Sequence, residues 1–229
     1  MKLLALDTST LTAGAAVLVD GQLVAERRNR VTTHSELLLA LLDGTLADAG
    51  LRPRDLDAVA CGAGPGSFTG LRIGLSTAKG LCFALGKPLA LVSSLEAVAA
   101  RAPDGRACAI LDAHKNEVYS ALYTIENGVP RALGSDGEQV LPPASLLAQL
   151  SAVELPLTLV GDGALRYREL FAPIGQPIDD DGSPRAADIA RLGLQALARG
   201  EAEPLGRSGP RYVRLSEPEL LKLKRERNQ

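Results

Sequence analysis

The residue run with the clearest chemical potential is glycine-rich: Gly64-Pro65-Gly66-Ser67-Phe68-Thr69-Gly70-Leu71-Arg72-Ile73-Gly74. Residues 56–61 before it are apolar and predict a buried strand, and residues 71–85 after it have helical composition. A glycine-rich turn from strand to helix presents backbone N–H groups, which suit an anion or a close backbone contact. It is no P-loop, because the first Lys after Gly64 is Lys79, and no dinucleotide motif, because Ser67 replaces the third glycine.

A second polar turn, Asp7-Thr8-Ser9-Thr10, follows a predicted strand at residues 3–6. Its hydroxyls suit phosphate and Asp7 suits a metal ion bound to phosphate, although the same side chains also stabilise ordinary turns. A complete phosphate site needs another such turn, and the chain offers Asp112-Ala113-His114-Lys115-Asn116, which lacks glycine. We therefore expect a degenerate phosphate-type turn and no tightly bound cofactor, with ATP or ADP binding only weakly or at the interface of a complex.

The sequence predicts no catalytic or metal-binding residues. The two histidines, His34 and His114, are 80 positions apart, and no His/Cys/Asp cluster has metal-ligand spacing. Ser67 does not form a Gly-x-Ser-x-Gly nucleophile elbow and is better interpreted as a helix N-cap. We expect a chain that is not an enzyme on its own. A nucleotide-dependent phosphotransferase or a glycoprotease-like hydrolase stays open as the alternative.

A leucine-rich helix predicted at residues 34–49 indicates a protein partner. Its leucines cover an arc of roughly 200°, about twice what a helix buried on one side needs. Gly70, Gly74 and Ala78 in the next helix have the spacing that lets another helix approach closely. A partner is favoured over the alternative that the C-terminal residues of this chain cover both surfaces. The expected interface residues are His34, Leu37, Leu38, Leu41, Leu42, Gly70, Arg72, Gly74 and Ala78.

Composition narrows the class of protein. The chain is 46% hydrophobic and 23% charged with a formal net charge of −2, which is typical of a globular protein and argues against a large nucleic-acid footprint. Three Phe, four Tyr and no Trp weaken a base-stacking hypothesis. Three scattered cysteines predict neither disulfides nor zinc, and we expect a reducing, cytoplasmic location with no membrane segment and no signal peptide.

The order of predicted elements repeats. Strands at residues 3–6, 13–19 and 23–28 are followed by helix 34–49, strand 56–61, helix 71–85, strand 88–92 and a short helix capped by Ser93 or Ser94. After Pro103-Asp104-Gly105 the series begins again, with strands at residues 107–112 and 117–125, a weaker one near Ala132, helix 143–149, strand 157–160 and helix 186–198. This order predicts the α/β actin-like/Hsp70/sugar-kinase (ASKHA) fold with two related subdomains, residues 1–103 and 104–229.

Several motifs together resemble the bacterial TsaB (YeaZ) family. They are the glycine-rich run, Leu4-Ala5-Leu6-Asp7-Thr8-Ser9-Thr10, His34-Ser35-Glu36-Leu37-Leu38, Val92-Ser93-Ser94-Leu95 and the sequence from Asp112 to Tyr119. Weaker matches follow at Gly161-Asp162-Gly163 and Pro210-Arg211-Tyr212-Val213-Arg214. The family usually has Asp-Ala-Arg where this chain has Asp112-Ala113-His114, so a role that needs that Arg is in doubt.

The resemblance implies a role in making threonylcarbamoyladenosine in tRNA. It implies a non-catalytic scaffold that pairs through its first two helices with the catalytic paralogue TsaD, which modifies the adenosine 3′ of the anticodon. TsaE, an ATPase, is expected to join the complex, and tRNA is expected to be reached through it. The isolated chain is expected to be a monomer or a homodimer. The basic tail, residues 222–227, is interpreted as a helix end in preference to an RNA-contacting arm.

Overall fold

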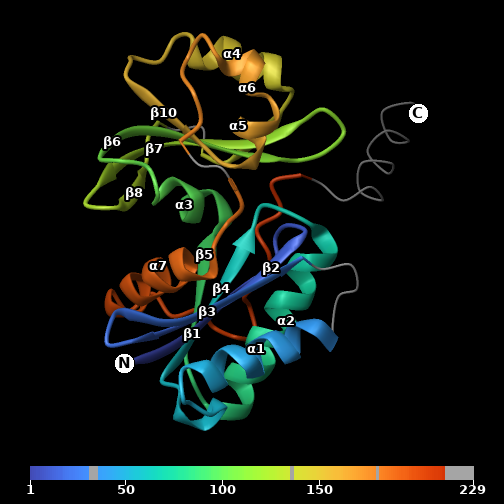
Figure 1. Cartoon of the computed structure of the whole chain (residues 1–229), viewed down its shortest axis with the longest axis vertical. Coiled ribbons are helices and arrows are strands. Elements are labelled where there is room, and N and C mark those ends of the chain that lie inside the picture. Colours follow the sequence, from blue (N-terminus) through green and yellow to red (C-terminus); the bar gives the residue numbers. More distant parts are fainter. Residues whose placement is uncertain (31–35, 135–136, 179–180, 215–229) are drawn as a thin grey trace.

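The computed structural model describes residues 1–229 except 31–35, 135–136, 179–180 and 215–229. Two units, each built on a five-stranded sheet, are stacked along the long axis of the molecule (Figure 1). His34 and the basic tail, on which two predictions depend, lie outside the described residues. The α/β class and the two-unit plan predicted from the order of elements are confirmed.

The first sheet has the strand order β3-β2-β1-β4-β5. Its strands are Lys2–Asp7 (β1), Thr12–Val19 (β2), Gln22–Arg30 (β3), Ala58–Gly64 (β4) and Leu89–Ser93 (β5). β1, β2 and β3 are antiparallel, and β1, β4 and β5 are parallel. Asp20 and Gly21 connect β2 to β3 with φ of 50° and 81°, which is the left-handed pair that a tight hairpin needs. The predicted hairpin is therefore confirmed.

Helices cover both faces of this sheet. They are α1 (Glu36–Asp48), α2 (Phe68–Leu85) and α7 (Ala186–Ala198). Successive residues of β1 point to opposite faces, so Leu4 and Leu6 pack in the core that contains α1 and α2, whereas Leu3 and Ala5 pack in the core that contains α7. Because both faces are covered, β1 and β4 are buried along almost their whole length.

The second sheet has the order β10-β6-β7-β8, with β9 also pairing β7. Its strands are Gly105–Asp112 (β6), Val118–Glu126 (β7), Val129–Ala132 (β8), Gln139–Leu141 (β9) and Leu157–Val160 (β10). The helices of this unit are α4 (Pro143–Leu150), α5 (Asp162–Arg166) and α6 (Arg168–Phe171). A further short helix, α3 (Ser94–Ala99), lies between the two sheets and contacts strands of both (Figure 1).

The units do not follow the predicted division of the sequence after residue 103. Helix α7 belongs to the second half of the chain but packs on β1, β2, β4 and β5 of the first sheet. Gly193 permits this, because a Cβ there would lie 2.5 Å from the Cβ of Ala60 on β4. The physical reason is burial: the first sheet has a second apolar face, and α7 is the helix that covers it.

Most predicted elements occur within a few residues of their expected bounds. Helix α2 begins three residues earlier than expected, because the Ser67 side chain accepts a hydrogen bond from Gly70 N and caps it there. Ser93 caps α3 in the same way, accepting from Leu95 N and Glu96 N. β9, α5, α6 and a 3₁₀ turn (Pro53–Asp55) were not predicted, since each is five residues or shorter and shows little periodicity.

Candidate functional site

The candidate site is a cleft of about 660 Å³ between the two units. The first unit contributes the turn after β1, the end of β3 and the start of α2, and the second contributes the β6–β7 turn and α5. The lining residues are Ser9, Thr10, Leu11, Thr12, Arg30, Gly66, Ser67, Phe68, Asp112, Ala113, His114, Tyr119, Asp162, Arg166, Ser183 and Arg214. Tertiary structure thus joins the two polar turns and the glycine-rich run that the sequence singled out.

Glycine is required at positions 66 and 70 of the first wall because both residues lie against the turn after β1. A Cβ at Gly66 would lie 2.3 Å from Ser9 O, and one at Gly70 would lie 2.0 Å from Thr8 O. Ser67 N donates to Ser9 O at 2.7 Å, and Thr8 Oγ1 donates to Gly70 O at 2.7 Å. The close backbone contact that the motif predicted is therefore made within the chain, between the glycine-rich run and the turn after β1.

Asp7 is fully buried behind that turn and does not line the cleft. Its Oδ2 accepts hydrogen bonds from Ser9 N at 3.1 Å and Ser9 Oγ at 2.8 Å, while Oδ1 has no partner among the described residues. Burial raises the pKa of Asp7 to about 6, against the lowering effect of these hydrogen bonds. Ser9 therefore binds one carboxylate oxygen of Asp7, and Thr10 and Thr12 are further hydroxyl residues of this wall that line the cleft.

The second wall is a turn of unusual backbone. His114, Lys115 and Asn116 have φ of 57°, 52° and 58°, so three consecutive non-glycine residues are left-handed. Hydrogen bonds close the turn, with Ala113 N donating to Glu117 O and Glu117 N donating to His114 O, both at 3.0 Å. Of these three residues His114 lines the cleft, and the closed turn fixes its backbone there.

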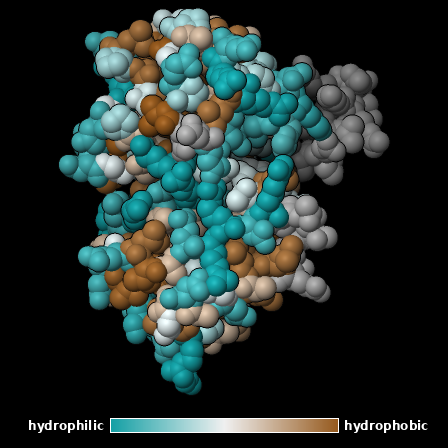
Figure 2. Space-filling model, in the orientation of Figure 1, coloured by the Kyte–Doolittle hydropathy of each residue, from teal (hydrophilic) through white to brown (hydrophobic). Residues whose placement is uncertain are grey.

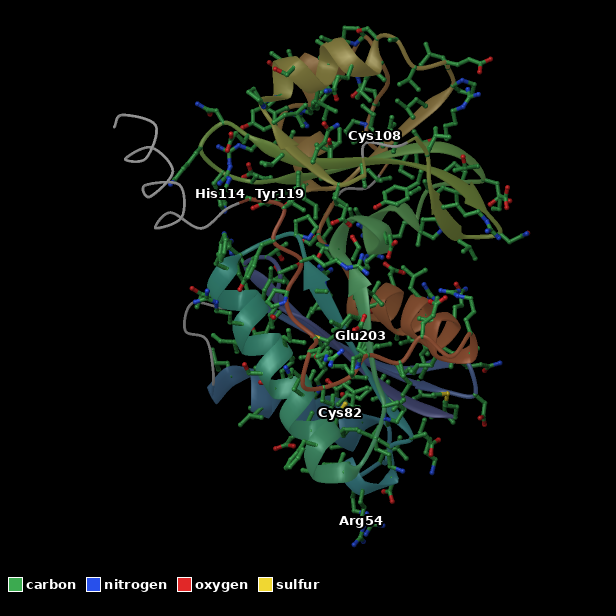
Figure 3. All side chains as sticks on the ribbon, turned by 180° about the vertical axis from the view of Figure 1, so that it is seen from behind. Arg54, Cys82, Cys108, His114, Tyr119 and Glu203 are labelled. Carbon is green, nitrogen blue, oxygen red and sulfur yellow. The ribbon has the colours of Figure 1, made fainter. Side chains whose placement is uncertain are left out.

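The charges of the second wall pair with one another. Asp112 accepts from Arg166 Nη1 at 2.6 Å through Oδ2, and His114 Nδ1 lies 3.2 Å from the same oxygen. Asp112 N donates to Asp162 Oδ1 at 2.9 Å, and burial raises the pKa of Asp162 to about 6. His114, which stands where the family that the sequence resembles usually has Arg, therefore contacts Asp112. Figure 3 shows His114 and Tyr119 on the side of the second sheet that faces the first unit.

The C-terminal segment of the described chain bridges the two units at the cleft. Tyr212 stacks on Phe68 of α2 with ring centroids 4.5 Å apart, and its hydroxyl oxygen accepts from Arg72 Nε at 3.0 Å. Two residues later, Arg214 Nη1 donates to Ala113 O at 2.9 Å and the guanidinium pairs with Glu117. In the sequence, this bridge corresponds to the motif Pro210–Arg214. Composition alone did not assign a role to that motif.

Most of the predicted leucine interface is core. Leu38, Leu41 and Leu42 are 2%, 9% and 3% exposed and pack with the first sheet, so the expectation that they lie at a partner surface is wrong. Leu37 is 40% exposed and keeps its predicted position on the surface. The arc is wide because α1 packs against β2 and β3 within a core that also includes α2 residues Leu75 and Ala78.

The small-residue series on α2 also faces inward. Gly70, Gly74 and Ala78 are buried, and a Cβ at Gly74 would lie 2.2 Å from Thr8 Oγ1. The close neighbour is this chain's own turn after β1, so the expectation that a partner helix lies there is corrected. The outward side of α2 carries Arg72, which is exposed as the interface prediction requires, and Phe83, which is 84% exposed and was not predicted.

Two features of the described part of the chain concern metal ions and membranes. No group of three or more His, Cys, Asp or Glu residues within it is arranged to hold a metal ion. Among the helices with described positions, none is long and apolar enough to cross a membrane. Figure 2 shows apolar side chains gathered in separate groups on the lower unit, with hydrophilic residues between them.

Comparison with known proteins gives consistent results. A family model described as "TsaD: tRNA N6-adenosine threonylcarbamoyltransferase" matches residues 28–191. The tRNA threonylcarbamoyladenosine biosynthesis protein TsaB of Bacillus subtilis is 32% identical over 227 residues, covering 96% of each chain. The solved structure of YeaZ from Pseudomonas aeruginosa superposes with a TM-score of 0.76 at 34% identity, covering 92% of this chain and 100% of that one.

A more distant structure bears on the fold alone. The activator of the 2-hydroxyisocaproyl-CoA dehydratase from Clostridium difficile, solved with bound ADPNP, aligns with a TM-score of 0.51 at 13% identity. The alignment covers 89% of this chain and 99% of that one. The ASKHA fold that the order of elements predicted is therefore confirmed by structural similarity.

Proposed function

Because the chain belongs to the TsaB (YeaZ) family, we propose that it is a non-catalytic scaffold subunit in the biosynthesis of threonylcarbamoyladenosine in tRNA. In this role it binds the catalytic paralogue TsaD, and the pair transfers a threonylcarbamoyl group to N6 of the adenosine 3′ of the anticodon. TsaE, an ATPase, joins that assembly, and the isolated subunit is a monomer or a homodimer.

The observation that carries the non-catalytic role is the internal use of the polar groups at both cleft turns. Ser9 O, Thr8 O and Thr8 Oγ1 are closed off by the glycine-rich run, and Asp112 is paired with Arg166 and His114. A phosphate or a metal ion at these turns would have to displace contacts that the fold already makes. We therefore propose that ATP and ADP bind weakly to the isolated subunit, or only at the interface of the complex.

The surface proposed for the paralogue is the exposed side of α1 and α2. Phe83 is 84% exposed, and Leu37 and Leu39 are 40% and 55% exposed. Burying each of these side chains in an interface would remove apolar surface from water. At about 25 cal/mol per Å² of apolar surface removed from water, an aromatic side chain is an effective anchor for such an interface. This surface retains the helices of the original prediction and replaces Leu38, Leu41 and Leu42 with residues that are accessible.

The test compares the chain alone, the paralogue alone and the mixture in a threonylcarbamoyl-transfer assay on tRNA. We expect activity only when both proteins are present, and calorimetric titration of the isolated chain with ATP should give no tight binding. Transfer catalysed by the isolated chain would contradict the scaffold role. Tight ATP binding with phosphate transfer to a small molecule would instead favour the phosphotransferase, the rival that the open cleft between the units supports.

A further inference from the structure

Positive charge is segregated in this acidic chain. No Asp or Glu occurs between Asp57 and Glu96, a stretch that contains Arg72, Lys79 and Lys87. Residues 204–214 also lack acidic side chains and contain three arginines. These two segments carry six positive charges and no negative charge in a protein of net charge −2, so the rest of the chain carries −8. The overall net charge therefore conceals a local basic surface.

The two segments lie side by side. Lys79 Nζ donates to Ser208 O at 3.1 Å, and Arg72 Nε donates to the Tyr212 hydroxyl at 3.0 Å. In Figure 3 the chain from Glu203 onward runs next to α2 toward the cleft. Two of the arginines serve other contacts, since Arg214 pairs with Glu117 and Arg211 lies within electrostatic reach of Glu138.

We call the surface formed by Phe68, Arg72, Lys79, Arg207 and Tyr212 the α2 face. Tyr212 is 43% exposed, although its ring is stacked on Phe68 with an interplanar angle of 15°. A stacked aromatic pair with an accessible ring beside cationic side chains is the arrangement on which unpaired nucleobases stack. Phe68 also lines the cleft, so the α2 face lies at its mouth.

We propose that the α2 face binds single-stranded RNA, with a base stacked on Tyr212 and phosphates near Arg72, Lys79 and Arg207. The proposal rests on the proposed function, which brings the subunit to a tRNA, and it adds that this chain touches the RNA directly. Phe83, the anchor of the proposed protein interface, lies fifteen residues beyond Phe68 on α2, about 22 Å at 1.5 Å per residue, and four residues, about 6 Å, beyond Lys79. The two surfaces therefore adjoin near Lys79, with the RNA at the cleft end of the helix.

The test measures binding of a fluorescein-labelled RNA hairpin with a single-stranded loop to the full chain, alone and assembled with the paralogue. Lys79→Glu combined with Arg207→Glu should weaken binding and lower the slope of log affinity against log salt by about 1.4. Tyr212→Ala should weaken it about tenfold, whereas Tyr212→Phe keeps the ring and should change it little. Arg54→Glu changes the net charge by the same amount as Lys79→Glu or Arg207→Glu alone and is the charge control for each single variant, because Arg54 is exposed at the tip of the first unit, away from the cleft (Figure 3).

Assembly with the paralogue is followed in parallel by size-exclusion chromatography, so that the two proposals fail separately. Normal assembly together with unchanged RNA affinity in the charge-reversal and Tyr212→Ala variants would overturn the RNA site and leave the scaffold role intact. Variants that lose the paralogue but keep RNA binding would assign the α2 face to a protein partner, which also overturns the proposal. Equal losses with Arg54→Glu would show that only overall charge matters. Photocrosslinking of the RNA to the peptide containing Tyr212 is the expected positive result.

Discussion

Thr8 occupies the space in which a side chain at position 74 would lie, because a Cβ on Gly74 would stand 2.2 Å from Thr8 Oγ1. The same hydroxyl donates to Gly70 O at 2.7 Å, one helical turn earlier. The contact fixes α2 against the turn after β1, and that turn forms one wall of the cleft. The glycine spacing on α2 is thus a requirement of the fold before it is a property of any interface.

Gly74→Leu is expected to destabilise the isolated chain by about 3 kcal/mol or more, because the added side chain must displace Thr8 from a packed site. Urea unfolding followed by circular dichroism measures the loss. The matched control is Gly80→Leu on the same helix, where a Cβ would meet nothing within 4 Å, and which should be neutral or slightly stabilising. Equal stability of the two variants would show that Thr8 does not constrain position 74.

Leu42→Glu is expected to prevent folding of the isolated chain, because Leu42 is 3% exposed within an apolar core. Burying an unpaired carboxylate there costs several kcal/mol beyond the lost packing. The measurement is the thermal melt of the purified chain, with Asp43→Glu on the exposed side of the same helix as control. A folded Leu42→Glu monomer that fails only in assembly would restore Leu42 to the interface.

Phe83→Asp is expected to leave the melting temperature of the chain nearly unchanged and to weaken assembly with the paralogue at least about tenfold. An 84% exposed ring contributes little to the fold and can be a major anchor once it is buried by a partner. Isothermal titration with the paralogue measures the effect. Val24→Asp, at a 47% exposed residue of β3, is the control for adding charge to the surface, and a similar loss with it would remove the special role of Phe83.

Asp7→Asn is expected to remove part of the pH dependence of stability. The folded-state pKa of Asp7 is raised from 3.8 to about 6, so the folded chain binds the proton more tightly than the unfolded chain between these values. The contribution of Asp7 to the free energy of unfolding therefore falls as the pH rises from about 4 to about 6. Lowering the pH from 7.5 to 5 should stabilise the wild type by about 1 kcal/mol through this group.

The measurement is the difference in unfolding free energy between wild type and Asp7→Asn at pH 7.5 and at pH 5. The unfolding free energy of Asp7→Asn relative to that of the wild type should be higher at pH 7.5 than at pH 5. The exposed Asp43→Asn provides the comparison for a surface carboxylate. An equal difference at both values would mean that Asp7 titrates in the folded chain as it does in the unfolded one.

The sequence by itself determined the elements whose signals are local. Asp20-Gly21 specified a hairpin, Ser67 and Ser93 specified helix starts, and the apolar period specified α7 over Ala186–Ala198. Each signal acts over about four residues through backbone angles, capping or side-chain period, so it holds whatever the rest of the chain does. The glycine-rich run likewise predicted a close backbone contact, because only residues without a Cβ atom permit such a contact.

Only the tertiary structure decided what the leucines of α1 and the small residues of α2 contact. The width of the leucine arc could not say that Leu38 and Leu42 meet the chain's own sheet, nor could the spacing of Gly74 name Thr8 as its neighbour. The pairing of Phe68 with Tyr212 joins residues 144 positions apart. Such contacts depend on which apolar faces find each other when the whole chain collapses, and that choice minimises exposed apolar surface over all elements at once.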